Sequence, residues 1–180
     1  MRWRDVNRPS GAVPDPGFAL LELYDAALPE VYGYLLSRCG EPPVAEDLTA
    51  ETFLAAVEAL RRQSPPDLTT AWLIGVARHK LVDHWRRLDR ERRRLRVLAG
   101  EPDEVEDPWD ERLDAMLARE VLATLSPYQR AALVLRYLDG LPVAQVAEHL
   151  DRTLHATEAL LVRAKAAFRR AYRAKEARDE

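Results

Sequence analysis

One stretch limits the fold more than any other: residues 71–96, AWLIGVARHKLVDHWRRLDRERRRLR. Its apolar residues recur at helical spacing, which predicts an amphipathic helix with that stripe packed on a core. The predicted stripe consists of Ile74, Ala77, Leu81, Trp85 and Leu88. The same helix ends in a run of positive charge, with seven arginines in the eleven positions 86–96.

The polar side of this helix is ordered as well. On a helical wheel His79, Asp83, Arg86 and Arg90 lie together, opposite the apolar stripe. Hydrogen-bonding groups followed by guanidinium groups are what base contact plus phosphate anchoring requires. The alternative is a solvated face with local ion pairs, because Asp89 and Glu91 can pair with neighbouring arginines.

The charge of the whole chain does not explain this run, because the 180 residues carry a net charge of -3. The basic residues are 24 arginines and 3 lysines. Arginine binds phosphate in a bidentate way that lysine cannot match, although genomic base composition would give the same bias. Seven glycines, against many Ala, Leu, Glu and Arg, favour an all-α fold.

Several classes of protein are not indicated. The one cysteine, Cys39, allows neither an internal disulfide nor a Cys-rich zinc site. No secretory signal and no apolar run of about 18 residues is visible, so we expect a cytoplasmic protein without membrane insertion. No phosphate-cradling loop or nucleophile motif is present, and we expect neither an enzyme nor a bound cofactor or metal.

The chain is predicted to contain two small helical domains, because a stretch with nine acidic and two basic residues among 101–120 separates two helical regions. Proline and charge near the start predict a disordered arm. The predicted segments are an arm (1–17), a first helical domain (18–97), a flexible acidic linker (98–117), a helix-turn-helix domain (118–175) and a tail (176–180).

The second domain has clear local signals. Ser126 and Gln129 form a capping-box pattern, and Gly140 ends the helix that follows. A short helix over 142–150, the turn DRT and a long last helix make a helix-turn-helix, whose second helix can enter a major groove. Its first turn would present His155, Glu158, Ala159 and Val162 to bases, and Arg163 and Lys165 to phosphates. Glu158 could equally be a charge at the helix start that the helix macrodipole favours.

Four segments together resemble the extracytoplasmic-function (ECF) group of bacterial sigma factors. They are AEDLTAETFLAAVEAL, AWLIGVARHKLVDHWRR, LSPYQRAALVLRYLDGLPVAQVAEHL and ATEALLVRAKAAFRRAY, in family order and at family spacing. The resemblance implies a sigma-2 helical bundle and a sigma-4 helix-turn-helix that bind core RNA polymerase. It also implies that sigma-2 reads and melts the −10 element and that sigma-4 binds the −35 element.

The resemblance also implies roles for particular residues. The −10 readers would be His79 and Asp83, with Arg61–Thr70 as the loop that holds a flipped base. Arg86, Arg87 and Arg90 would hold the −10 backbone, and Arg152 would join the phosphate contacts of the −35 domain. Asp47 and Glu51 would bind polymerase, and an anti-sigma protein is an expected partner. The alternative is a stand-alone helix-turn-helix regulator, which uses only residues 120–175.

Overall fold

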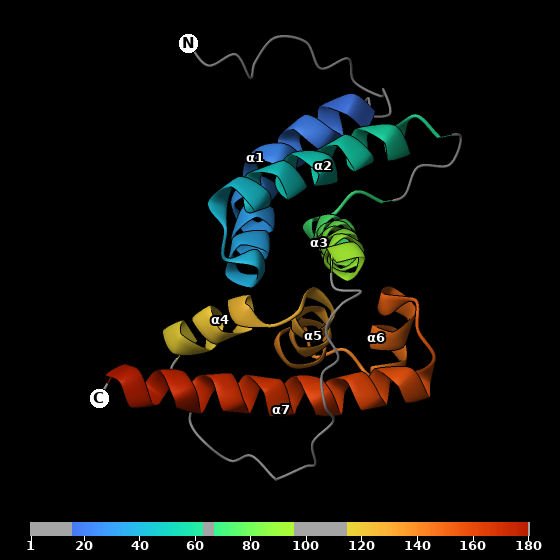
Figure 1. The fold of residues 1–180 in the computed structure, drawn as a ribbon. Coiled ribbons are helices and arrows are strands. Elements are labelled where there is room, and N and C mark those ends of the chain that lie inside the picture. Colours follow the sequence, from blue (N-terminus) through green and yellow to red (C-terminus); the bar gives the residue numbers. More distant parts are fainter. Residues whose placement is uncertain (1–15, 63–66, 96–114, 180) are drawn as a thin grey trace, which may run out of the picture.

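The computed structural model describes residues 16–62, 67–95 and 115–179, and no strand occurs among them (Figure 1). The predicted arm, except for its last two residues, and most of the acidic linker lie outside these ranges. The all-α prediction is confirmed. The helices are α1 (Pro16–Cys39), α2 (Pro42–Leu60), α3 (Thr70–Leu95), α4 (Ala115–Thr124), α5 (Pro127–Leu133), the π-helix η2 (Val134–Leu138), α6 (Val143–Leu150) and α7 (Leu154–Asp179).

Helix α3 lies between two groups of helices. It packs against α1 and α2 on one side and against α5 and α6 on the other, as Figure 1 shows. The second group rests on the long helix α7, which contacts α4, α5 and α6. Buried apolar side chains of both groups form one continuous cluster, from Ala27 in α1 to Tyr172 in α7. The two groups are called here the N-terminal half (α1–α3) and the C-terminal half (α4–α7).

The buried stripe of α3 differs from the predicted one at its end. Ala77, Leu81 and Trp85 are buried as expected, but Leu88 is 37% exposed. Asp89 is buried instead, and its carboxylate pairs with Arg93 at 2.6 Å (Nε to Oδ2). The prediction for Leu88 was wrong because α3 has neighbours on two sides, so its buried surface is not one straight apolar stripe.

Helix α1 runs as one helix from Pro16 to Cys39 and bends along its length, as Figure 1 shows. Pro29 lies inside it and is exposed. A proline in a helix leaves the carbonyl four residues earlier without its N–H partner. That carbonyl belongs to Asp25, which is also exposed, so water can take the place of the missing donor.

Two predicted boundaries of the C-terminal half differ from the structure. Helix α4 begins at Ala115, inside the predicted linker, since Leu117 packs against the core cluster. Helix α7 runs to Asp179, through nearly all of the predicted tail. An ion pair between Lys175 of α7 and Glu120 of α4 fixes this last part, which is rich in helix-forming Ala, Lys, Glu and Arg.

The helix predicted to end at Gly140 changes its hydrogen bonding before that residue. The Asp139 N–H donates to the Val134 carbonyl at 3.0 Å, five residues back, and Gly140 follows with φ of 68°. No signal in the sequence predicts this π-turn. Widening of the last turn re-aims the residue at its end, and such turns often occur at functional positions.

Candidate nucleic-acid interface

The polar face of α3 combines exposed groups with paired ones. His79, Asp83, Arg87 and Arg90 are exposed, as base and phosphate contacts would require. Arg86 is partly buried, and its guanidinium contacts two carboxylates. Its Nη2 lies 3.0 Å from Asp151 Oδ2 in the C-terminal half, and its Nη1 lies 3.6 Å from Asp83 Oδ1.

The predicted −10 readers face the helix-turn-helix across a small cleft. The cleft has a volume of about 340 Å³ and is lined from α3 and α6 by His79, Val82, Asp83, Arg86, Gln145, Glu148 and His149. The rings of His79 and His149 lie 4.5 Å apart, centroid to centroid. Burial lowers the pKa of His149, and His79 and Arg78 lower it further. Both predicted readers remain exposed beside α6, and the Asp83 side chain is 68% exposed.

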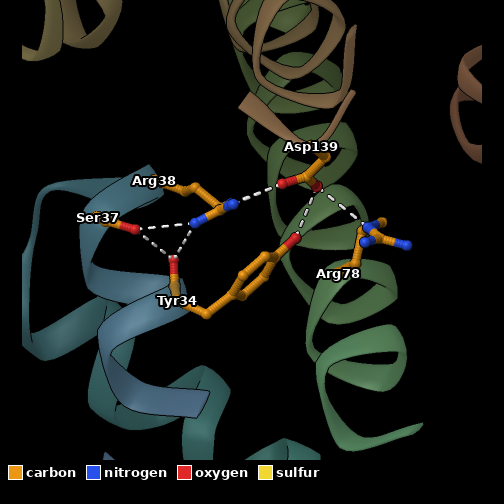
Figure 2. A network of polar contacts seen from close by, with 5 residues as sticks. All are labelled: Tyr34, Ser37, Arg38, Arg78 and Asp139. Atoms are coloured by element: carbon orange, nitrogen blue, oxygen red, sulfur yellow. Dashed lines mark hydrogen bonds and ion pairs between the residues drawn. The ribbon is translucent and has the colours of Figure 1, made fainter. Parts of the chain in front are cut away.

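Asp139, at the end of the π-turn, joins the two halves, as Figure 2 shows. Its carboxylate accepts hydrogen bonds from the Tyr34 hydroxyl at 2.8 Å, from Arg38 Nε at 2.8 Å and from Arg78 Nε at 3.1 Å. The Asp139 side chain is only 1% exposed. The Arg38 guanidinium also lies 3.7 Å from the centre of the Tyr34 ring. Burial, followed by the Asp139 charge, raises the pKa of Tyr34 and keeps it a donor.

A buried arginine makes a second connection between the halves. Arg130 of α5 donates from Nη2 to the Cys39 carbonyl at 2.6 Å, at the end of α1. Its guanidinium carbon lies 5.8 Å from the centre of the Trp85 ring of α3. Burial lowers the pKa of Arg130, and the carbonyl contact offsets part of the cost of burying its charge.

The helix-turn-helix has the predicted turn. Asp151 ends α6 in the left-handed conformation, with φ of 53° and ψ of 53°, in the place where glycine is common. Thr153 caps α7, since its Oγ1 accepts the Ala156 N–H at 3.2 Å. Val146, Ala147 and Leu150 of α6 are buried, as are Leu161, Ala164 and Phe168 of α7.

The residues predicted to contact the −35 element lie along the start of α7. His155, Glu158 and Arg163 are exposed, whereas Ala159, Val162 and Lys165 are partly buried. Arg152 is held at the turn, where its guanidinium carbon lies 4.5 Å from the centre of the Tyr128 ring.

The remaining predicted positions lie away from this face. Asp47 is exposed on α2, and Glu51 on the same helix pairs with Lys80 of α3 at 3.5 Å. Part of the loop predicted to hold a flipped base, 63–66, lies outside the described residues. At its end, the Trp72 N–H donates to Thr69 Oγ1 at 3.1 Å, which caps α3.

Two kinds of feature are absent from the described residues. No helix among them is long and apolar enough to cross a membrane. Within the same ranges, no three or more His, Cys, Asp or Glu side chains are grouped so that they could hold a metal ion.

Comparison with known proteins matches a different family region to each half of the chain. Residues 23–91 match the family described as sigma-70 region 2, and residues 115–168 match sigma-70 region 4. The chain is 31% identical over 153 residues to the ECF RNA polymerase sigma factor SigL of Mycobacterium tuberculosis, covering 79% of this chain and 82% of SigL. The chain belongs to the ECF group of sigma-70 factors. This sigma factor is also 35% identical over 150 residues to the ECF RNA polymerase sigma factor BldN of Streptomyces coelicolor. The match covers 79% of this chain and 56% of BldN.

A solved structure has the same fold. The sigma factor RpoE of Bartonella quintana, crystallised with the anti-sigma factor NepR, superimposes on this sigma factor with a TM-score of 0.52. The match covers 86% of this chain and 97% of RpoE at 19% identity.

The groups that join the halves were missed by sequence reasoning. They are Tyr34, Arg38, Arg78, Arg130 and Asp139. One signal was present for Asp139, because an acidic residue at the C-terminal end of a helix is opposed by the helix macrodipole. Such a residue needs a cationic partner, and this one has two.

Proposed function

We propose that this ECF sigma factor binds core RNA polymerase in the cytoplasm and directs it to promoters with −10 and −35 elements. It would act by binding and not by catalysis. The observation that carries the proposal is the order of two family regions on two helical halves, each with an arginine-bearing helix suited to DNA. A stand-alone operator-binding protein would leave α1, α2 and α3 without a role.

The proposal divides the work between the halves. His79 and Asp83 would contact bases of the −10 element, and Arg86, Arg87 and Arg90 would bind its phosphates. The start of α7 would lie in the major groove at the −35 element, with His155 and Glu158 exposed toward it. Arg152, Arg163 and Lys165 would contact the backbone there, and Asp47 and Glu51 would contact polymerase.

Control by an anti-sigma protein is part of the proposal on the ground of family membership.

Transcription with purified core polymerase tests this function directly. Genomic DNA would be transcribed with and without the protein, and the 5′ ends of the transcripts would be mapped. The proposal predicts discrete start sites that depend on the protein and share two upstream elements. If no such starts arise and the protein does not bind core polymerase, the operator-binding alternative replaces the proposal.

A further inference from the structure

We infer that Glu158 selects a cytosine in the −35 element, by accepting a hydrogen bond from the N4 amino group of that base in the major groove. This inference rests on the proposed function and deepens it, because the proposed function places the start of α7 at the −35 element. Glu158 is exposed and is the fifth residue of α7, next to the helix-turn-helix turn. Its carboxylate would set one base of the promoter sequence that this sigma factor recognises.

No group of the described fold uses the charge of Glu158. Among the described residues, its carboxylate takes part in no hydrogen bond and no ion pair. Helical ion pairs join residues three or four positions apart, and no arginine or lysine lies at those distances from Glu158. The one titratable residue there is His155, which is exposed as well. The carboxylate is therefore available to a ligand.

The helix macrodipole does not account for this acidic residue. A negative charge is favoured in the first turn of a helix, and the effect falls off beyond that turn. The first turn of α7 contains no acidic residue, and Glu158 follows it. The N–H groups at this helix start already have acceptors, since Ala156 donates to Thr153 Oγ1 at 3.2 Å and Thr157 to the Thr153 carbonyl at 3.0 Å. Stabilisation of the helix is thus not a sufficient reason for a carboxylate at this position.

Glu158 lies beside the outward side of α7. The inner side of the helix is marked by three buried residues, Thr157, Leu161 and Ala164. On a helical wheel, His155, Ala159 and Val162 lie opposite these residues, with Glu158 at the edge of their group. A carboxylate among phosphate-binding arginines weakens binding to DNA in general, because phosphates repel it. A contact to one particular base would offset that cost.

The chemistry of a carboxylate favours cytosine over the other bases. An ionised glutamate accepts hydrogen bonds and donates none. In the major groove, cytosine presents the N4 donor, whereas guanine presents two acceptors and thymine presents an acceptor and a methyl group. Adenine presents a donor beside the N7 acceptor, and that pair suits the amide of glutamine or asparagine better than a carboxylate.

The test is transcription by holoenzyme from a promoter library randomised over the −35 element, with the transcribed templates sequenced. The variants are Glu158→Gln and Glu158→Ala. The matched control is Glu176→Gln, which makes the same change of charge at an exposed position of α7. Glu176 lies about 27 Å further along the helix, at about 1.5 Å per residue.

The inference predicts one −35 position at which the unchanged chain and the control prefer cytosine about tenfold. Glu158→Gln should change that preference to adenine, because glutamine pairs with N6 and N7 of adenine. Glu158→Ala should abolish the preference there and leave the other positions as they were. Cytosine retained by Glu158→Gln would overturn the inference. So would an equal loss of preference at every position, since that result would mean that Glu158 only supports the helix.

Selection of duplex DNA by the full chain without polymerase, at low salt, separates this inference from the proposed function. If transcription fails while this selection still changes from cytosine to adenine in Glu158→Gln, the proposed function is wrong and the reading by Glu158 stands. If transcription succeeds and the base preference is the same in all variants, only the reading by Glu158 is wrong.

Discussion

The Tyr34 hydroxyl donates to the Asp139 carboxylate at 2.8 Å across 105 residues of sequence. The contact joins α1 of the N-terminal half to the π-turn of the C-terminal half. It places a nearly fully buried carboxylate beside two arginines, and a buried carboxylate is stable only when such partners surround it.

The turn at Asp151 is a test of backbone strain. Asp151→Val places a β-branched residue at φ of 53°. Its free energy of unfolding should be about 1–2 kcal/mol lower than that of the Asp151→Gly variant. Asp151→Gly also removes the contact to Arg86 but fits the left-handed conformation, so it is the matched control. Urea denaturation of both variants gives the difference, and equal stabilities would show that the turn carries no strain.

The exposed arginines of α3 are predicted to bind phosphates. Arg87→Ala with Arg90→Ala should reduce transcription from all promoters of this sigma factor. It should also lower the salt dependence of holoenzyme binding by about one unit of slope for each arginine. The control is Arg119→Ala, on the exposed side of α4. Loss at some promoters and not at others would mean that these arginines read sequence.

The bases of the −10 element are predicted to be read by His79 and Asp83. Either His79→Ala or Asp83→Ala should change the preferred −10 sequence, because each removes one hydrogen-bonding group and leaves the phosphate contacts in place. Selection from a promoter library randomised at the −10 element measures the preference. An unchanged preference would remove the substituted residue from the set of readers.

Acid should weaken the fold through His149. Its pKa is lowered from about 6.5, first by burial and then by His79 and Arg78, with Glu148 and Asp139 opposing the shift. The unfolded chain then binds this proton more readily than the native one, so the free energy of unfolding falls as pH drops below about 6.5.

Thermal unfolding at pH 7.5 and 5.5 checks this effect. The melting temperature should be lower at pH 5.5, and His149→Gln should reduce the difference. A part of the difference will remain, because burial also lowers the pKa of His84. The same difference in the variant and in the unchanged chain would contradict the role given to His149.

The sequence predicts the parts of this fold that depend on local signals. The capping box at Ser126 places the start of α5, where the Ser126 N–H donates to Gln129 Oε1 at 3.3 Å. The periodicity of Val146 and Leu150 gives the inner face of α6. The start of α5 and the inner face of α6 depend only on residues close together in the sequence. Capping chemistry and apolar periodicity are therefore sufficient to predict them.

The polar contacts between the two halves could not be predicted in the same way. Asp139 meets partners that lie 61 to 105 residues away, and such pairs leave no period in the sequence. For Leu88 the sequence signal was present but misleading. Its spacing fits the apolar stripe, whereas the packing of α3 on two sides leaves it exposed. Periodicity finds a face of a helix, but the neighbours decide how much of the helix is covered.

The most direct measurement tests the division of labour between α3 and α7. An iron chelate that cleaves nearby DNA would be attached to a cysteine in place of Arg87 or of His155, in holoenzyme bound to a promoter. The account predicts cleavage near the −10 element from position 87 and near the −35 element from position 155. Cleavage at one element from both positions would contradict it.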